Sequence, residues 1–257
     1  MLETTPKRTS GMRKAYHIAQ EMVRDQLREH DPAAAAELED VRESDIIVTR
    51  GQYDHIESVL KLASTPHTVA DPAHLEAAGL RPDQVLFVNC PGSFSPTALR
   101  KVECFVREGG FLFTTDWALK NVLEPAFPGH VEYNSQATSD EVVRVEILAA
   151  EDPYLQSLIG PEDDPQWWLE GSSYPIRVLD PEKVKVLVTS KEIARKYGEE
   201  AVFVTFDYGE GKIYHMISHF YLQRTETRTE RHRGSGSNYA SEKTMSPALM
   251  AKYKAMG

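Results

Sequence analysis

The chain of 257 residues carries 29 Lys and Arg against 39 Asp and Glu, a net charge of −10. This acidic balance argues against binding to a nucleic-acid backbone, which requires a basic face. The only cysteines, Cys90 and Cys104, exclude a disulfide framework and a four-cysteine zinc site. Apolar runs stay below the ~18 residues of a membrane span, and no apolar signal-peptide segment opens the chain. We therefore expect a soluble, cytoplasmic protein that binds neither membrane nor nucleic acid.

Residues 1–44 are predicted to form an N-terminal helical extension. Apolar residues recur at spacings of three and four from Met12 to Leu27, as in an amphipathic helix. Asp31-Pro32 interrupts this pattern, and proline in a first turn favours a second helix after it. The apolar stripe predicts packing against the flank of a sheet or against a second subunit.

Strands alternate with helices over the next eighty residues. Apolar runs at 45–49, 67–71, 83–89 and 111–115 predict strands. Helical spacing lies between them at 53–62 and after Ser95-Pro96, where Gly109-Gly110 ends the second helix. This alternation predicts right-handed βαβ units and an α/β, flavodoxin-like, doubly wound and mostly parallel sheet.

The C-terminal half is predicted to add strands to this sheet. Alternation at 141–148 and apolar runs at 174–179 and 184–189 predict strands within an inserted β region of about 130–190, and 152–158 predicts a short helix. Residues 201–207 and 213–219 flank a glycine turn and predict a β-hairpin. The α/β domain is thus expected to span 45–222, followed at 223–257 by a polar tail with a short terminal helix.

In such sheets ligands bind outside the carboxyl ends of the strands. The catalytic candidates there are Cys90, Asp116 and His219. The candidate ligand-binding residues are Gly51, Tyr53, His55, Gly92, Ser93, Trp117 and His215. We expect the strand ends at Gly51, Gly92 and Asp116 to border one pocket, with Asp116 and His219 at its rim, where side chains contribute little packing.

Two stretches carry a family resemblance. The run Val85–Gly92 with its helix and following strand, and the hairpin Tyr208–His219, resemble the class I glutamine amidotransferase-like superfamily. The sequence motifs are most similar to those of the trehalose-utilisation (ThuA-like) branch, over residues 45–125 and 200–222. The resemblance implies that His219 matches the family's catalytic histidine. The family's nucleophilic cysteine is replaced by Asp116 and its orienting acid by Tyr221, so we expect no glutaminase activity.

The candidate residues admit alternatives. Cys90 could be a thiolate favoured by the following helix N-terminus or a buried small hydrophobe. Asp116 could act as a base, bind a sugar hydroxyl or cap a helix. His215 and His219 lie four apart on a predicted strand and would share one face, but no dense ligand motif accompanies them, so we expect neither metal nor cofactor. Trp167-Trp168 could stack on a sugar or a partner, or cover the core.

Two functions follow. The first is a degenerate, non-catalytic amidotransferase-like domain, a pseudoenzyme that binds or scaffolds a protein partner or a second copy of itself. The alternative is a hydrolase or isomerase for a small polar or carbohydrate-like substrate that uses Asp116 and His219, with Cys90 as a further candidate. Convergence of Cys90, Asp116 and a histidine within hydrogen-bond reach in an open cleft favours the enzyme. A side chain such as Trp117 that fills this space favours the binding module.

Overall fold

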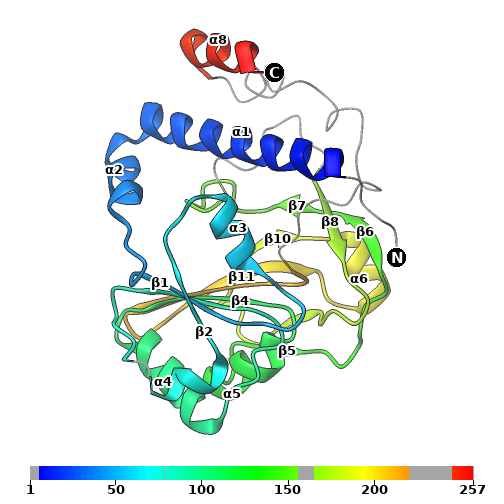
Figure 1. The fold of residues 1–257 in the computed structure, drawn as a ribbon. Helices are drawn as coiled ribbons and strands as arrows, with labels where there is room; N and C mark the ends of the chain where they lie inside the picture. The colour runs from blue at the N-terminus through cyan, green and yellow to red at the C-terminus, as the bar shows by residue number, and fades with distance from the viewer. Residues whose placement is uncertain (1–5, 78, 156–164, 220–244, 257) are drawn as a thin grey trace. The chain divides into compact units, whose positions relative to one another are not determined.

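The structure is a computed structural model that describes residues 6–77, 79–155, 165–219 and 245–256 (Figure 1). The described residues fall into two compact units. One lies within Met1–Arg42, Ser58–Pro66 and Leu222–Gly257, and the other within Glu43–Glu57 and His67–Tyr221. The division of the chain into an extension at 1–44, an α/β domain at 45–222 and a tail at 223–257 stays a prediction. In the described ranges, no helix is long and apolar enough to cross a membrane.

The smaller unit is helical. It contains α1 (Pro6–His30), α2 (Pro32–Asp40) and α8 (Pro247–Met256). The Asp31 carboxylate accepts the Ala34 N–H at 3.0 Å and caps α2, whose first residue is proline. The predicted pair of helices and the break between them are therefore confirmed.

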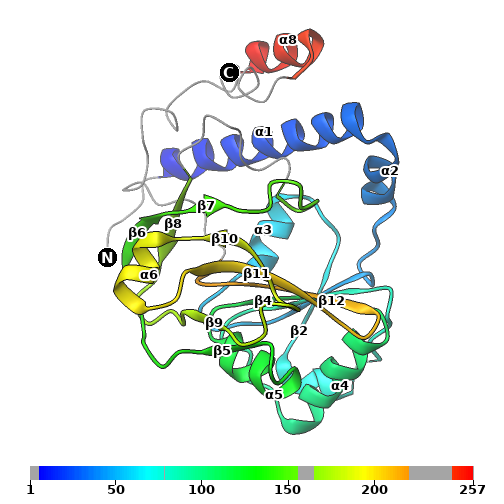
Figure 2. The same cartoon turned by 180° about the vertical axis from the view of Figure 1, so that it is seen from behind.

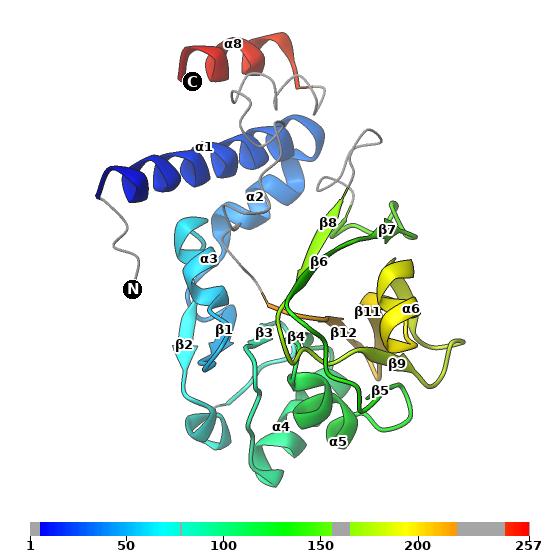
Figure 3. The ribbon, with the colours of Figure 1, turned by 90° about the vertical axis from the view of Figure 1, so that its right-hand side faces the viewer.

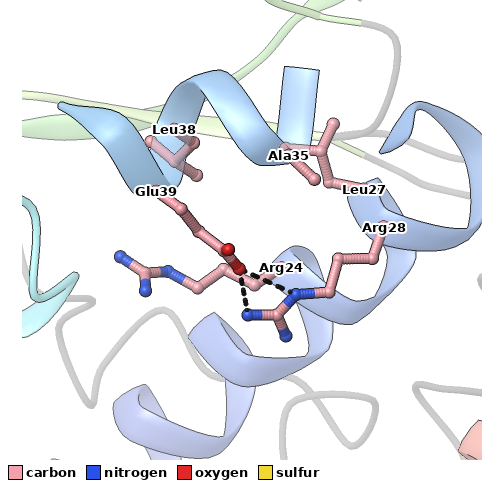
Figure 4. A pocket seen from close by; sticks show the side chains of 6 residues that line it. All are labelled: Arg24, Leu27, Arg28, Ala35, Leu38 and Glu39. Carbon is pink, nitrogen blue, oxygen red and sulfur yellow. Dashed lines mark hydrogen bonds and ion pairs between the residues drawn. The ribbon is translucent and has the colours of Figure 1, made fainter. Parts of the chain in front are cut away.

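A small depression lies between α1 and α2 (Figure 4). Its lining residues are Arg24, Leu27, Arg28, Ala35, Leu38 and Glu39. Glu39 Oε1 accepts from Arg28 Nη2 at 2.7 Å and from Nε at 3.2 Å. Because both side chains are exposed, this pair contributes little stability.

The larger unit is built on a sheet of ten described strands. Eight follow the order β2-β1-β3-β4-β12-β11-β10-β7, while β9 pairs with β5 and β11. The strands are β1 (Ile46–Thr49), β2 (Thr68–Ala70), β3 (Val85–Val88), β4 (Phe111–Thr115), β5 (Val131–Tyr133), β7 (Glu146–Ile147), β9 (Ile176–Val178), β10 (Lys185–Thr189), β11 (Ala201–Tyr208) and β12 (Gly211–Met216). The five strands from β2 to β12 are parallel and the β12-β11-β10-β7 pairs are antiparallel. The α/β, flavodoxin-like fold class is confirmed.

The helices predicted at 53–62 and after Ser95-Pro96 are present, and further helical segments follow β2 and β4. They are α3 (Ile56–Leu62), a 3-10 turn η1 (Pro72–Glu76), α4 (Pro96–Arg107), a π-helical turn η2 (Leu119–Leu123) and α5 (Glu124–Ala126). The Ser95 hydroxyl accepts the Ala98 N–H at 3.1 Å and starts α4. The helices α4 and α5 lie on the same side of the sheet, and buried residues such as Val102 and Phe105 join the main core (Figures 1 and 2).

The strand order places a topological switch point in the sheet. From β1 the chain moves outward to β2 and then returns to β3 on the opposite side of β1. The carboxyl ends of β1, β3, β4 and β12 share one edge because these strands are parallel (Figure 3). Ligands of doubly wound sheets bind at this edge.

Three local expectations differ from the structure. The predicted strand at 141–148 is divided, because β6 (Glu141–Arg144) pairs with β8 (Gln166–Leu169) as a separate sheet while β7 pairs with β10. Residues 151–155 form turns instead of the predicted helix, and 156–158 lie outside the described residues. The helix α6 (Lys191–Tyr197) was not predicted, although Ser190 caps it and Gly198 ends it with φ of 81°.

Gly211 offers a direct test of the packing of the hairpin against α4. A Cβ at this position would run into the carbonyl oxygens of Val106 and Gly110. We predict that Gly211→Ala lowers the free energy of unfolding by about 1–3 kcal/mol. Each kcal/mol should lower the melting temperature by roughly 2–4 °C. Gly79→Ala is the control, because no atom lies within 4 Å of its added Cβ. Equal melting temperatures for both variants in calorimetry would show that this close approach is absent.

Candidate active site

Three neighbouring parallel strands bring Cys90, Asp116 and His219 together. Cys90 lies two residues beyond β3, Asp116 directly follows β4, and His219 lies three residues beyond β12. One sulfur, one carboxylate oxygen and one ring nitrogen from these residues lie within 4.8 Å of one another. All three side chains are buried rather than at a rim, so the rim expectation for Asp116 and His219 is wrong.

Asp116 occupies a sharp turn between β4 and the helical segment after it. Its φ is 45°, a left-handed conformation that Asp tolerates better than most residues. The same strand–turn–helix geometry exposes the nucleophile in hydrolase elbows. The carboxylate accepts the Tyr174 N–H at 2.8 Å and the Ser173 O–H at 3.0 Å. The N-cap position of the following helical turn is Ala118 and not Asp116, whose carboxylate instead binds residues 173–174, so capping does not explain it.

The His219 ring lies between two carboxylates. Its Nε2 is 3.2 Å from Asp116 Oδ2, and its Nδ1 is 2.7 Å from Glu170 Oε2. Burial lowers the pKa of His219, but the neighbouring Asp116 and Cys90 outweigh burial and raise it to about 10. The ring is therefore a buried imidazolium at neutral pH.

Cys90 is held through its backbone carbonyl by the segment that follows β1. Its carbonyl accepts the Gln52 N–H at 3.0 Å and the Tyr53 N–H at 3.4 Å. Gly51 permits this approach, since a Cβ there would lie 2.6 Å from the Cys90 oxygen. Burial raises the pKa of the Cys90 thiol, which His219 only partly offsets. Without a further cation, the group is a thiol.

A row of aromatic rings runs beside the buried cluster. Trp117 meets Tyr53 edge-on at 5.3 Å and stacks on Tyr174 at 5.5 Å, and Tyr174 stacks on Tyr133 at 3.8 Å. The indole N–H of Trp117 donates to the Ser172 carbonyl at 2.7 Å, which fixes its ring. Tyr53 ends the row and is 44% exposed.

The other candidate residues lie apart from this cluster or make different contacts. His215 does not share a strand face with His219, because β12 ends at Met216. Its Nδ1 is instead 2.8 Å from Thr114 Oγ1 within the sheet, and burial lowers its pKa to about 3. His55 is exposed and pairs with Glu57 at 3.2 Å, and Ser93 is exposed.

Gly92, a predicted ligand-binding residue, packs closely against the η2 turn. Its φ is 67°, and a Cβ there would lie 2.8 Å from Val122 Cγ2. Glycine is therefore required by the backbone conformation and by the nearby η2 turn.

Sequence reasoning did not assign Glu170, Ser173 and Tyr174 to the site. All three follow β8, which is remote in sequence from β4 and β12. Trp167 holds this segment in place, because its indole N–H donates to the Ile217 carbonyl at 3.0 Å and its ring packs on the main core. In the sequence, the adjacent pair Trp167-Trp168 was the one sign that this segment packs against the site. Tyr221 lies outside the described residues.

No family model and no curated protein matches the sequence. Among solved structures, the cytoplasmic protein STM1381 from Salmonella typhimurium LT2 is similar at 12% identity and a TM-score of 0.50, over 81% of this chain and 99% of that chain. A ThuA-like protein from Bacteroides uniformis ATCC 8492 is similar at 11% identity and a TM-score of 0.49, over 69% of this chain and 82% of that chain. The cytoplasmic protein STM3548 from Salmonella typhimurium is similar at 14% identity and a TM-score of 0.49, over 68% of this chain and 87% of that chain. At these identities, the likeness to STM1381 concerns the fold alone.

The charge on His219 predicts a pH-dependent contribution to stability. A histidine pKa raised from 6.5 to about 10 stabilises the folded state fully below pH 6.5, and this contribution disappears as the pH rises through 10. The melting-temperature difference between wild type and His219→Gln should therefore be largest below pH 6.5 and shrink toward pH 10. Calorimetry in metal-free buffer measures this difference.

The matched control for this experiment is His74→Gln. The His74 side chain is 76% exposed and pairs only with Asp71 on the surface. Its melting temperature should follow that of the wild type at every pH. A constant gap between wild type and His219→Gln from pH 6.5 to 10 would contradict the buried imidazolium.

Proposed function

We propose that this protein is a hydrolase for a small polar or carbohydrate-like substrate, with Cys90, Asp116 and His219 at its reaction centre. The observation that supports this proposal is the buried His219 ring between Asp116 and Glu170, with Cys90 beside it. Removing such groups from water costs several kcal/mol per ion before pairing. Titratable groups with perturbed pKa values concentrate at catalytic sites.

Each residue of the cluster has a separate role in the proposed reaction. Asp116 and His219 face each other at 3.2 Å and can pass a proton to or from a substrate oxygen. Glu170 at Nδ1 keeps the ring oriented during this transfer. Tyr53, at the exposed end of the aromatic row, offers a face on which a sugar ring can stack.

A binding or scaffold module is the second candidate. It is favoured by the burial of the cluster and by Trp117, whose ring fills the space between Tyr53 and Tyr174. In this case the expected occupant is a protein partner or a second copy of the chain.

We also propose that the chain is a divergent member of the amidotransferase-like superfamily of the ThuA-like type. Asp116 at the positive-φ turn after β4 stands where that family has its cysteine. Free Cys90 and Cys104 fit a reducing compartment, so the proposed location is the cytoplasm.

Hydrolysis can be tested with a panel of glycosides, sugar esters and N-acyl sugars. Asp116→Asn and His219→Gln should each lower kcat/KM by about 10²–10⁴-fold on any substrate that the wild type cleaves, the usual contribution of a positioned proton-transfer group. Glutamine should release no ammonia, since Asp116 replaces the thiol at the elbow. The control His74→Gln should keep full activity.

Two outcomes would reject the enzyme. One is full activity in both variants with correct folding by circular dichroism. The other is a wild-type protein that cleaves no member of the panel but binds a sugar or a partner protein, which favours the binding module.

A further inference from the structure

We propose that Cys90, Asp116 and His219 are the ligands of one divalent transition-metal ion of the zinc class. The inference deepens the proposed function, on which the use of the ion in hydrolysis rests. In the metal-bound protein, Asp116 and His219 would act as ligands instead of proton-transfer groups, and the ion would supply the activation of water. Sequence reasoning predicts no metal, because the three ligands come from distant segments and form no local motif. The parallel strand ends bring them together.

The donor set fits this class of ion. It offers one sulfur, one imidazole nitrogen and one carboxylate oxygen, all within 4.8 Å of one another. Zinc binds these donors at about 2.3, 2.0–2.1 and 2.0–2.2 Å, so donors around one ion lie roughly 3–4 Å apart. The His219 and Asp116 atoms already meet this requirement at 3.2 Å. A sulfur ligand disfavours Mg²⁺ and Ca²⁺, which prefer oxygen.

The groups around the donors support the same assignment. A metal-bound histidine usually donates its other ring N–H to a carboxylate or carbonyl, and His219 Nδ1 is 2.7 Å from Glu170 Oε2. This leaves Nε2 facing Asp116 and the cluster. Ligating carboxylates are also hydrogen-bonded in turn, as Asp116 is by the Ser173 hydroxyl and the Tyr174 N–H.

The number of ligands indicates what kind of site this is. Structural zinc sites have four protein ligands, whereas catalytic sites have three and keep one position for water or substrate. Among the described residues, Cys90, Asp116 and His219 are the one group whose donor atoms converge in this way. Three ligands on the edge of a doubly wound sheet therefore suit a site that acts on a bound molecule.

Cobalt(II) is the probe, because it substitutes for zinc and reports its ligands by absorption. Metal-free full-length protein should bind one Co²⁺ per chain in equilibrium dialysis, with a sulfur-to-cobalt charge-transfer band in the near ultraviolet. Cys90→Ser should abolish this band, and the matched Cys104→Ser variant should retain it. Glu170→Gln should weaken Co²⁺ binding by about 10–100-fold while the band persists, as expected for an orienting residue.

Cys90→Ser is checked for folding by circular dichroism. If it fails to fold, Glu170→Gln serves in its place, because the Glu170 side chain is 34% exposed. Absence of stoichiometric Co²⁺ binding, or a charge-transfer band that survives Cys90→Ser, would overturn the metal site.

The two proposals fail separately. Hydrolysis that persists undiminished in chelator-treated, metal-free protein would overturn the use of the ion in hydrolysis and leave the hydrolase standing. Stoichiometric Co²⁺ bound through Cys90 in a protein that cleaves no substrate would support the metal site and reject the hydrolase.

Discussion

Parallel pairing of β3, β4 and β12 is the constraint on which the site depends. Adjacent parallel strands end at the same edge, so the residues that follow them meet without any local sequence motif. The Asp116 N–H donates to the Met216 carbonyl at 3.0 Å, which joins the ends of β4 and β12 directly. A hairpin strand that paired antiparallel to β4 would carry His219 to the opposite edge.

Burial and pairing then determine the chemistry of the cluster. Without a carboxylate partner, a histidine in this interior would lose its proton because burial lowers its pKa, and two carboxylates alone would repel each other. Together, Asp116, His219 and Glu170 satisfy one another, and β8 supplies the third member through the contact of Trp167 with the chain after β12. The same arrangement places the three donors for a metal ion, since Glu170 directs the ring toward Asp116. Metal binding would displace the proton on His219 Nε2 and the proton of the Cys90 thiol.

The sequence predicts the parallel sheet well because its signals are local. Apolar runs such as 111–115 and the Ser95 cap depend on neighbouring residues alone, and β4 has the bounds that were expected. Asp116 and His219 could be named because they follow strands. Glu170 could not be assigned, because its place depends on the pairing of β6 with β8, which divides an alternating stretch that resembles one strand. The burial of Asp116 likewise depends on tertiary contacts with 173–174.

A double-mutant cycle between Asp116 and His219 tests the central interaction most directly. Unfolding free energies of Asp116→Asn, His219→Gln and the double variant give the coupling between the two side chains. We expect the sum of the two single effects to exceed the effect of the double variant by more than about 1 kcal/mol, since either change alone removes the partner that the other buried group has in this pair. Effects that add within about 0.5 kcal/mol would show that Asp116 and His219 do not interact, and would contradict the account.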